Sequence, residues 1–377
     1  MGNFDDIRPY RDEEFAEIFA ELVQEEEFVS ILKYFFQDAY LLYLDKLKSV
    51  KTLDEFQVTL IKPILLGIIQ ASTSNLTYSG TVNIPVKEPC LFISNHRDIV
   101  MDPSLIDYGL HLNNVPTVEI AIGDNLLVKP WIEKLVKLNK SFIVRRSLSG
   151  RELLMSSKHL SEYIHHSLAE RKCYLWIAQR EGRAKDGNDH TQEGLLRMLS
   201  MAGDSKDVRQ SLQPLNIIPV SISYEYDPCD WLKARELWMK AMGKEFIKTP
   251  EDDLLNMVTG IRGHKGNVNF HFAPSINNRL HEVVETEPRQ QVEKIATIID
   301  EGIYSSYVLS DTHKTAYNML TGTNTFDIPE QKSEEIKNYF IGQLEKAGLS
   351  ENELKYIIVQ YANPVINYLK TMEKNQK

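Results

Sequence analysis

The segment SNHRDIVMDPS carries the residues best suited to acid–base chemistry in this sequence. It places His96 directly after a short apolar run, with carboxylates two and six residues later at Asp98 and Asp102. A histidine oriented by a carboxylate can deprotonate a hydroxyl group near neutral pH, because the acid fixes the imidazole tautomer and stabilises the imidazolium. We therefore expect a general-base pair formed by His96 and one of these two aspartates. Taken alone, a His–Asp pair is explained more simply by a histidine that caps the next helix or bonds a backbone carbonyl.

Positive charge is concentrated in residues 126–151, although the whole chain has a net charge of -10. This segment contains seven basic residues and one acidic residue. Arg145 and Arg146 stand at the end of the apolar run SFIVR, where a side chain can point into a strand-end crevice. Because the planar guanidinium group suits phosphate, we expect Arg145 to bind an anionic group, with Arg146 as a further candidate. The lysines of this segment are explained more simply as a solvated helix face.

A third polar segment, QREGRAKDGNDHTQEG, follows the apolar run CYLWIA. It carries Arg180, Arg183 and Lys185 in a glycine-containing loop that precedes a helical pattern. Such a loop can present both backbone N–H groups and arginine side chains to an anion. Its acidic residues weaken this interpretation, and a plain surface loop explains the segment equally well.

The elements that position these residues are short apolar runs that alternate with amphipathic helical patterns, the clearest helix being 151–171. The predicted strands are CLFIS (90–94), TVEIAI (117–122), SFIVR (141–145), CYLWIA (173–178), NIIPVSIS (216–223) and VNFHFA (268–273). This alternation predicts an α/β fold with a largely parallel mixed sheet flanked by helices. Sites in such sheets form at the carboxyl ends of the strands, where the polar segments described above stand.

We expect three regions along the chain. They are a helical N-terminal region (1–77), an α/β domain (78–275) and a helical C-terminal region (276–377). The most apolar N-terminal segment, LIKPILLGII, is too short to span a membrane. A helix buried against the main domain is the favoured interpretation of this segment, and interfacial membrane contact is the alternative. The C-terminal region shows no chemistry of its own.

Composition narrows the class of protein. The 377 residues are 42% hydrophobic and 25% charged, as in ordinary globular proteins, and the acidic net charge argues against general nucleic-acid binding. Cys90, Cys173 and Cys229 are widely separated, which fits a reducing compartment and neither a disulfide framework nor a metal site. The N-terminal residues lack both a signal peptide and a myristoylation pattern, so we expect a cytoplasmic protein.

The order of these segments resembles the glycerolipid acyltransferase family, especially its glycerol-3-phosphate and dihydroxyacetone-phosphate branch. The first family block, a histidine followed by four residues and an aspartate, is matched by SNHRDIVMD. The second block is matched by GDNLLVKP and FIVRRS, the third by REGRAKDG, and the fourth by IIPVSISYEYDP. The likeness covers residues 78–275, and the second block is its most specific part.

The resemblance implies roles for these residues. His96 would be the base, an aspartate would orient it, and Arg145, Arg146 and Arg183 would hold the phosphate of the acceptor. The fourth block would shape the acyl pocket. Further site candidates are Asn125, Arg180, Glu181 and Lys185.

The chain departs from the family pattern in two places. Five residues separate His96 from Asp102, where the family has four. We prefer Asp102 as the partner, because the segment PSLIDYGL after it matches the family's register, and Asp98 is the alternative. In the third block, one alignment places Arg180 where the family has a glutamate, whereas alignment on Glu181 removes one residue from the loop.

From the residues and the resemblance together we expect an acyltransferase of phospholipid synthesis. It would move a fatty-acyl group from acyl-CoA or acyl carrier protein to a hydroxyl of a glycerol-phosphate acceptor, without metal or other cofactor. The insoluble product implies work at a membrane surface, peripherally and at its inner face. The alternatives are a lysophosphatidate acyltransferase, a non-catalytic lipid- or acyl-carrier-binding protein of the same fold, and a lipid-ester hydrolase, for which no Gly-x-Ser-x-Gly motif is present.

Overall fold

The computed structural model describes residues 3–203, 205–247 and 249–376, and within them the central element is a seven-stranded sheet. The strand order is β1-β7-β6-β2-β5-β3-β4. The strands are β1 (Thr73–Ser79), β2 (Leu91–Ser94), β3 (Glu119–Gly123), β4 (Ser141–Val144), β5 (Leu175–Ala178), β6 (Ile218–Tyr224) and β7 (Gly266–Phe272). Neighbouring strands are parallel except β6 and β7, which are antiparallel. The expected α/β class with a largely parallel mixed sheet is confirmed.

The six strands predicted from apolar runs all occur, with ends shifted by at most two residues. The sequence did not reveal β1, which has the polar sequence TSNLTYS. This strand lies at the edge of the sheet and pairs with β7 alone, so most of its side chains are exposed or half-buried. An edge strand needs no continuous apolar run, and β1 therefore lacks the feature that identified the others.

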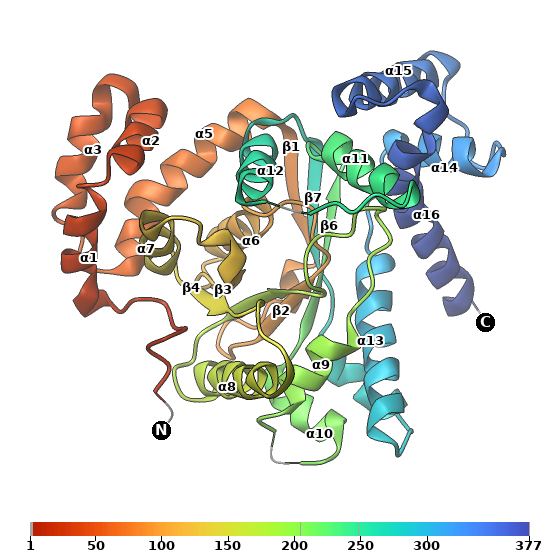
Figure 1. Cartoon of the computed structure of the whole chain (residues 1–377). Coiled ribbons are helices and arrows are strands. Elements are labelled where there is room, and N and C mark those ends of the chain that lie inside the picture. The colour runs from red at the N-terminus through yellow and green to blue at the C-terminus, as the bar shows by residue number, and fades with distance from the viewer. Residues whose placement is uncertain (1–2, 204, 248, 377) are drawn as a thin grey trace.

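Helices surround the sheet (Figure 1). Before the sheet's second strand come α1 (Phe15–Leu22), α2 (Glu26–Phe36), α3 (Tyr40–Leu47), α4 (Leu53–Phe56) and α5 (Lys62–Ser72). Between β2 and β7 come α6 (Met101–Leu112), α7 (Pro130–Leu138), α8 (Gly150–Ala169), α9 (Glu193–Ser200), α10 (Val208–Leu212), α11 (Asp230–Ala241) and α12 (Pro250–Arg262). After the sheet come α13 (Pro288–Tyr304), α14 (Asp311–Thr321), α15 (Glu330–Ala347) and α16 (Lys355–Asn375).

The sheet has an apolar core on each face. On one face, α8, α9, α10 and α13 pack against side chains such as Ile93, Phe142 and Ile177. On the other face, α5 and α6 pack against side chains such as Phe92 and Trp176. The consecutive residues Phe92 and Ile93 thus point to opposite cores, as expected for a strand that helices cover on both sides.

The helical N-terminal and C-terminal regions each add a further apolar cluster. Figure 1 shows α1, α2 and α3 at the edge of the molecule beside α7, and α14, α15 and α16 on the opposite side beside α11. The N-terminal cluster includes Leu138 of α7, and the C-terminal cluster includes Ala234 of α11. The expected boundaries of the three regions stay predictions, but both additions share side chains with the central part of the chain.

The apolar segment LIKPILLGII forms most of α5. Its Leu65 and Ile68 are buried in the core of the sheet, whereas Leu66 is exposed. This placement agrees with the favoured interpretation of a helix packed on the main domain. Among the residues that the structure describes, every helix falls short of the length and hydrophobicity that crossing a bilayer requires.

The loop between β5 and α9 is seated on α16. The carbonyl of Asp186 accepts a hydrogen bond from Nδ2 of Asn363 at 2.9 Å. Gly187 has a φ of +71°, and a Cβ at that position would lie 2.1 Å from the backbone oxygen of Gln360. Gly187 therefore meets two requirements, a left-handed backbone and a close approach to a helix, that no other residue type satisfies.

We expect Gly187→Ala to destabilise the protein more than Gly182→Ala. Gly182 has a φ of +67° in the same loop, but nothing lies within 4 Å of the position of its Cβ, so alanine there adds only the left-handed strain of about 1 kcal/mol. Alanine at Gly187 adds a clash with α16. Thermal unfolding of both variants measures the difference, and equal melting temperatures would show that this loop is not seated on α16.

Candidate active site

The segment SNHRDIVMDPS contains the loop that joins β2 to α6 at the carboxyl end of the strand. His96 lies in this loop, and Asp102 lies in the first turn of α6. Nδ1 of His96 and Oδ2 of Asp102 are 2.8 Å apart. The same oxygen accepts hydrogen bonds from the backbone N–H groups of Arg97, at 2.6 Å, and Asp98, at 3.0 Å. The carboxylate is thus fixed by the loop that carries the histidine, and it holds a proton on Nδ1 while leaving Nε2 as the basic atom.

The side chain of Asp98 has other hydrogen-bond partners than that of Asp102. Its Oδ1 accepts hydrogen bonds from the backbone N–H groups of Val100 and Met101, at 2.9 and 2.8 Å, so it caps the first turn of α6. Its side chain is buried against Gly260 of α12, where a Cβ would come within 1.9 Å of Oδ2. Burial and the nearby carboxylate of Asp102 raise the pKa of Asp98. Of the two candidate partners, the structure brings Asp102 to the imidazole of His96.

Two further side chains hold the histidine and its loop. The amide of Asn95 forms two hydrogen bonds with the backbone of Ile222, accepting from its N–H at 2.8 Å and donating to its carbonyl at 2.9 Å. The Trp176 ring lies edge-on to the imidazole of His96, with 5.6 Å between the ring centroids, and its Nε1 donates to Oγ of Ser94. The sequence showed an asparagine before the histidine, but nothing in it indicated that Asn95 joins the loop to β6.

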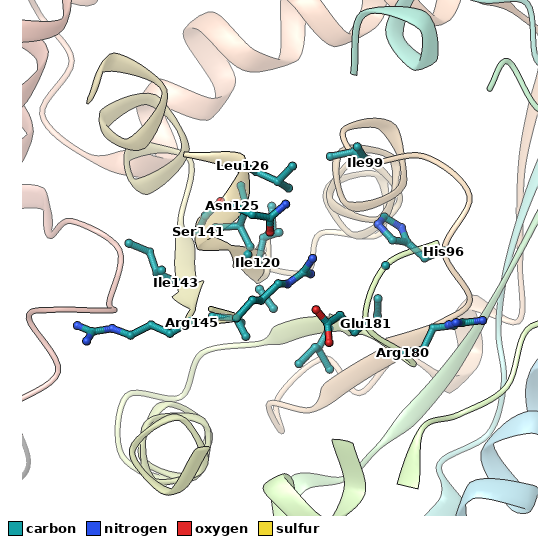
Figure 2. Close-up of a pocket in the computed structure, with 18 of the residues that line it drawn as sticks. His96, Ile99, Ile120, Asn125, Leu126, Ser141, Ile143, Arg145, Arg180 and Glu181 are labelled. Atoms are coloured by element: carbon teal, nitrogen blue, oxygen red, sulfur yellow. The ribbon is translucent and has the colours of Figure 1, made fainter. Parts of the chain in front are cut away.

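A cavity of about 890 Å³ opens beside His96. Figure 2 shows His96 and Ile143 on opposite sides of the cavity, with Ile120, Asn125 and Leu126 among the residues between them. Much of the lining is apolar and comes from β3, β4 and α8, including Ile122, Val144, Leu153 and Leu160. The cavity therefore joins a basic imidazole to a space lined by aliphatic side chains.

The two neighbouring arginines of the second segment point in different directions. Arg145 is about half exposed, donates a hydrogen bond to Oδ2 of Asp6 at 2.9 Å, and extends away from His96 in Figure 2. The Arg146 guanidinium lies over Gly123, where a Cβ would be 2.5 Å from its Nε and 2.6 Å from Oδ1 of Asn125. Both arginines line the cavity, and Arg146 is the one whose guanidinium lies beside Gly123 and Asn125 at the end of β3.

The third segment brings Arg183 and Lys185 to the cavity lining. Arg183 is buried and donates to Oδ1 of Asn256 at 2.8 Å, while its other terminal nitrogen, Nη1, has no hydrogen-bond partner among the described residues. Lys185 pairs with Glu236 at 3.0 Å, and burial, with the nearby Arg183, lowers the pKa of Lys185 to about 8. Arg183 thus brings a buried positive charge to the wall of the cavity.

The remaining candidates line the same cavity. Figure 2 shows Arg180 and Glu181 extending from the loop in opposite directions. Asn125 donates to Oδ2 of Asp253 at 3.2 Å and so connects the end of β3 to α12. Asp253 and Met257, both from α12, were not anticipated from the sequence, because no catalytic pattern marks this helix. The catalytic and binding roles of all these residues stay predictions.

Other chemistries find little support in this region. Burial raises the pKa of the Cys229 thiol to about 12 and that of Cys173 to about 11, and Cys90 is fully buried. None of the three lines the cavity. Among the described residues, no group of histidine, cysteine and acidic side chains has the arrangement of a metal site.

Comparison with known proteins finds a family model that matches this part of the chain. Residues 75–223 match the family model described as Acyltransferase, and this span includes His96, Asp102, Arg146 and Arg183. This part of the chain is therefore an acyltransferase domain, and the family-level resemblance of the four sequence blocks is confirmed. No curated protein matches the sequence.

Among solved structures, one similar chain is the 1-acyl-sn-glycerophosphate (LPA) acyltransferase PlsC from Thermotoga maritima. It shares 13% sequence identity, the match covers 75% of this chain and 94% of that chain, and the TM-score is 0.38. A likeness this distant carries no detail of the site.

The two aspartates near His96 should differ in their effect on turnover. We expect Asp102→Asn to lower the kcat of acyl transfer at least tenfold more than Asp98→Asn. An amide at position 102 loses the charge that stabilises the imidazolium, whereas asparagine at position 98 still caps the helix. Kinetics of both purified variants at saturating substrates test this, and a greater loss in Asp98→Asn would assign the partner role to Asp98.

Proposed function

We propose that the protein transfers a fatty-acyl group from a thioester donor, acyl-CoA or acyl carrier protein, to a hydroxyl of glycerol 3-phosphate or a related glycerol-phosphate acceptor. The observation that carries the proposal is the position of the His96–Asp102 pair at one side of a cavity that combines aliphatic walls with Arg146 and Arg183. The aliphatic walls suit an acyl chain, and the two guanidinium groups suit a phosphate.

In the proposed reaction, Nε2 of His96 takes the proton from the acceptor hydroxyl. The oxygen attacks the thioester carbonyl, the carbon–sulfur bond breaks, and the departing thiolate receives the proton from the imidazolium. Asp102 stabilises the imidazolium between these two steps. The reaction balances without a metal ion or redox cofactor.

The hydrophobic product favours a place of action at a membrane surface. An acylated glycerol phosphate gains free energy by entering lipid, at about 0.8 kcal/mol for each buried CH₂ group. We therefore propose peripheral association at the cytoplasmic face of a membrane. A lysophosphatidate acceptor is the second candidate, since it combines the same phosphate with an acyl chain that the aliphatic walls of the cavity suit.

The reaction itself can be tested by following thiol release from acyl-CoA or acyl carrier protein. We expect release that depends on the glycerol-phosphate acceptor, because attack requires the acceptor hydroxyl. Release without any acceptor would instead indicate a thioesterase. No release with either donor and either acceptor would favour a lipid-binding protein that has lost catalysis.

His96→Ala should lower kcat by about 10²- to 10⁴-fold, because removing a general base costs this much. The His96 side chain is 13% exposed, and its loss takes one of three donors from the buried carboxylate of Asp102. We therefore expect the variant to keep the wild-type circular dichroism and to melt a few degrees lower. A folded variant with more than a tenth of wild-type turnover would contradict the role of His96 as the base.

Arg146 and Arg145 form a matched pair for testing the phosphate site. Arg146→Ala should raise the KM for the acceptor about tenfold or more and spare the KM for the donor, because a charge-assisted hydrogen bond contributes about 1.5–3 kcal/mol. Arg145→Ala removes the same charge from a surface ion pair and should change either KM less than threefold. A larger effect of Arg145→Ala would assign the acceptor phosphate to Arg145 instead.

A further inference from the structure

Arg97, which follows the proposed base, is held at three points. Its backbone N–H donates to Oδ2 of Asp102 at 2.6 Å, and its carbonyl accepts from Nζ of Lys233 at 3.2 Å. Its buried guanidinium pairs with Oδ2 of Asp189 at 2.7 Å. The Arg97 N–H therefore bonds to the same oxygen that accepts from His96, so a shift of Arg97 would move the carboxylate that orients the imidazole.

Asp189 connects this arrangement to the rest of the molecule. It belongs to the loop that carries Arg180, Glu181 and Arg183, and its side chain is fully buried. Its Oδ2 accepts from the Tyr307 hydroxyl at 3.2 Å, and its carbonyl accepts from the Tyr304 hydroxyl at the end of α13. One carboxylate thus joins the loop of the base, the loop of the arginines and the C-terminal region.

A contribution to stability is a weak explanation for burying the Arg97–Asp189 ion pair. Taking two charges out of water costs several kcal/mol per ion, and replacing a buried ion pair by apolar residues of similar size is often neutral or stabilising. An ion pair, unlike an apolar pair, fixes both the direction and the distance between two backbone segments. Here the two segments are the two active-site loops.

We infer that Arg97 and Asp189 are positioning residues, which fix the loop of His96 against the anion-binding loop and make the C-terminal region part of the active-site support. This inference rests on the proposed function for its kinetic consequence. The orientation of His96 can also be measured without turnover, so the two ideas can fail separately.

The test removes the buried pair as a unit. Single substitutions leave an uncompensated buried charge, so the variant combines Arg97→Met, Asp189→Leu and Tyr307→Phe, which removes the charges and the hydroxyl that would lose its acceptor.

The matched control is a second cluster of arginine, carboxylate and tyrosine at the opposite end of the sheet. Arg171 bonds to Glu119 at 2.6 Å, and the Tyr163 hydroxyl donates to the same carboxylate. The control variant combines Arg171→Met, Glu119→Leu and Tyr163→Phe.

Two readouts are taken on the full-length proteins. In ¹⁵N-histidine NMR, the resonance absent from His96→Ala identifies His96, and we expect the wild-type ring to carry its proton on Nδ1. In the Arg97 triple variant the His96 nitrogens should shift toward a mixture of tautomers, and kcat should fall at least tenfold. The control variant should keep the wild-type His96 resonance and a kcat within threefold of the wild type.

An unchanged His96 resonance in the folded Arg97 triple variant would overturn the inference, whether or not the protein transfers acyl groups. A displaced resonance with unchanged turnover would also overturn it. Should the triple variant not fold, Arg97→Lys, which keeps the charge but loses the planar fork, should displace the resonance and lower kcat at least threefold. Wild-type behaviour of Arg97→Lys would then refute the positioning role. Absence of acyl transfer by the wild type would count against the proposed function alone.

Discussion

The carboxylate of Asp102 is the group on which the geometry of this site depends. Its Oδ2 accepts from the imidazole of His96 and from two backbone N–H groups of the same loop. A fully buried carboxylate is stable only when such donors replace water, so the loop must fold around it. The direction of the imidazole follows from this requirement, since its Nδ1 can reach the carboxylate in only one orientation of the ring.

The sheet explains why residues distant in sequence meet at this point. Strands β2, β3, β4 and β5 run parallel, so the loops after them all lie at the carboxyl ends of the strands, on one side of the sheet. The loop after β2 supplies His96, the loop after β3 supplies Asn125, the chain after β4 supplies Arg146, and the loop after β5 supplies Arg183. The aliphatic residues of β3 and β4 form the wall between them. An acid–base group, a candidate anion site and an apolar wall are thus brought together by one sheet topology.

Much of this arrangement could be predicted from the sequence, because it is local. Apolar runs identified six strands, and the positions of His96 and Arg183 after such runs placed them at one edge of the sheet. The choice between Asp98 and Asp102 needed the structure, since both spacings permit a bond to His96. Arg145 and Arg146 are adjacent, and their directions depend on how the chain leaves β4, where the regular alternation of a strand ends.

Other features could not be predicted because they join distant parts of the chain. Arg97 and Asp189 form an ion pair across 92 residues, and nothing in either segment indicates the other. The sequence predicted no chemistry for the C-terminal region, yet Tyr304 and Tyr307 both bond to Asp189. Strand β1 was missed because an edge strand carries polar residues, and its position depends on β7, which lies far along the sequence.

We propose direct transfer, in which His96 activates the acceptor hydroxyl and no side chain of the protein carries the acyl group. Intact-mass spectrometry of the purified protein, quenched with acid after incubation with acyl-CoA and no acceptor, tests this most directly. Direct transfer predicts an unmodified protein mass and no free thiol until glycerol 3-phosphate is added. A protein heavier by one acyl group, with one equivalent of thiol released before any acceptor is present, would rule out direct transfer and indicate a covalent intermediate.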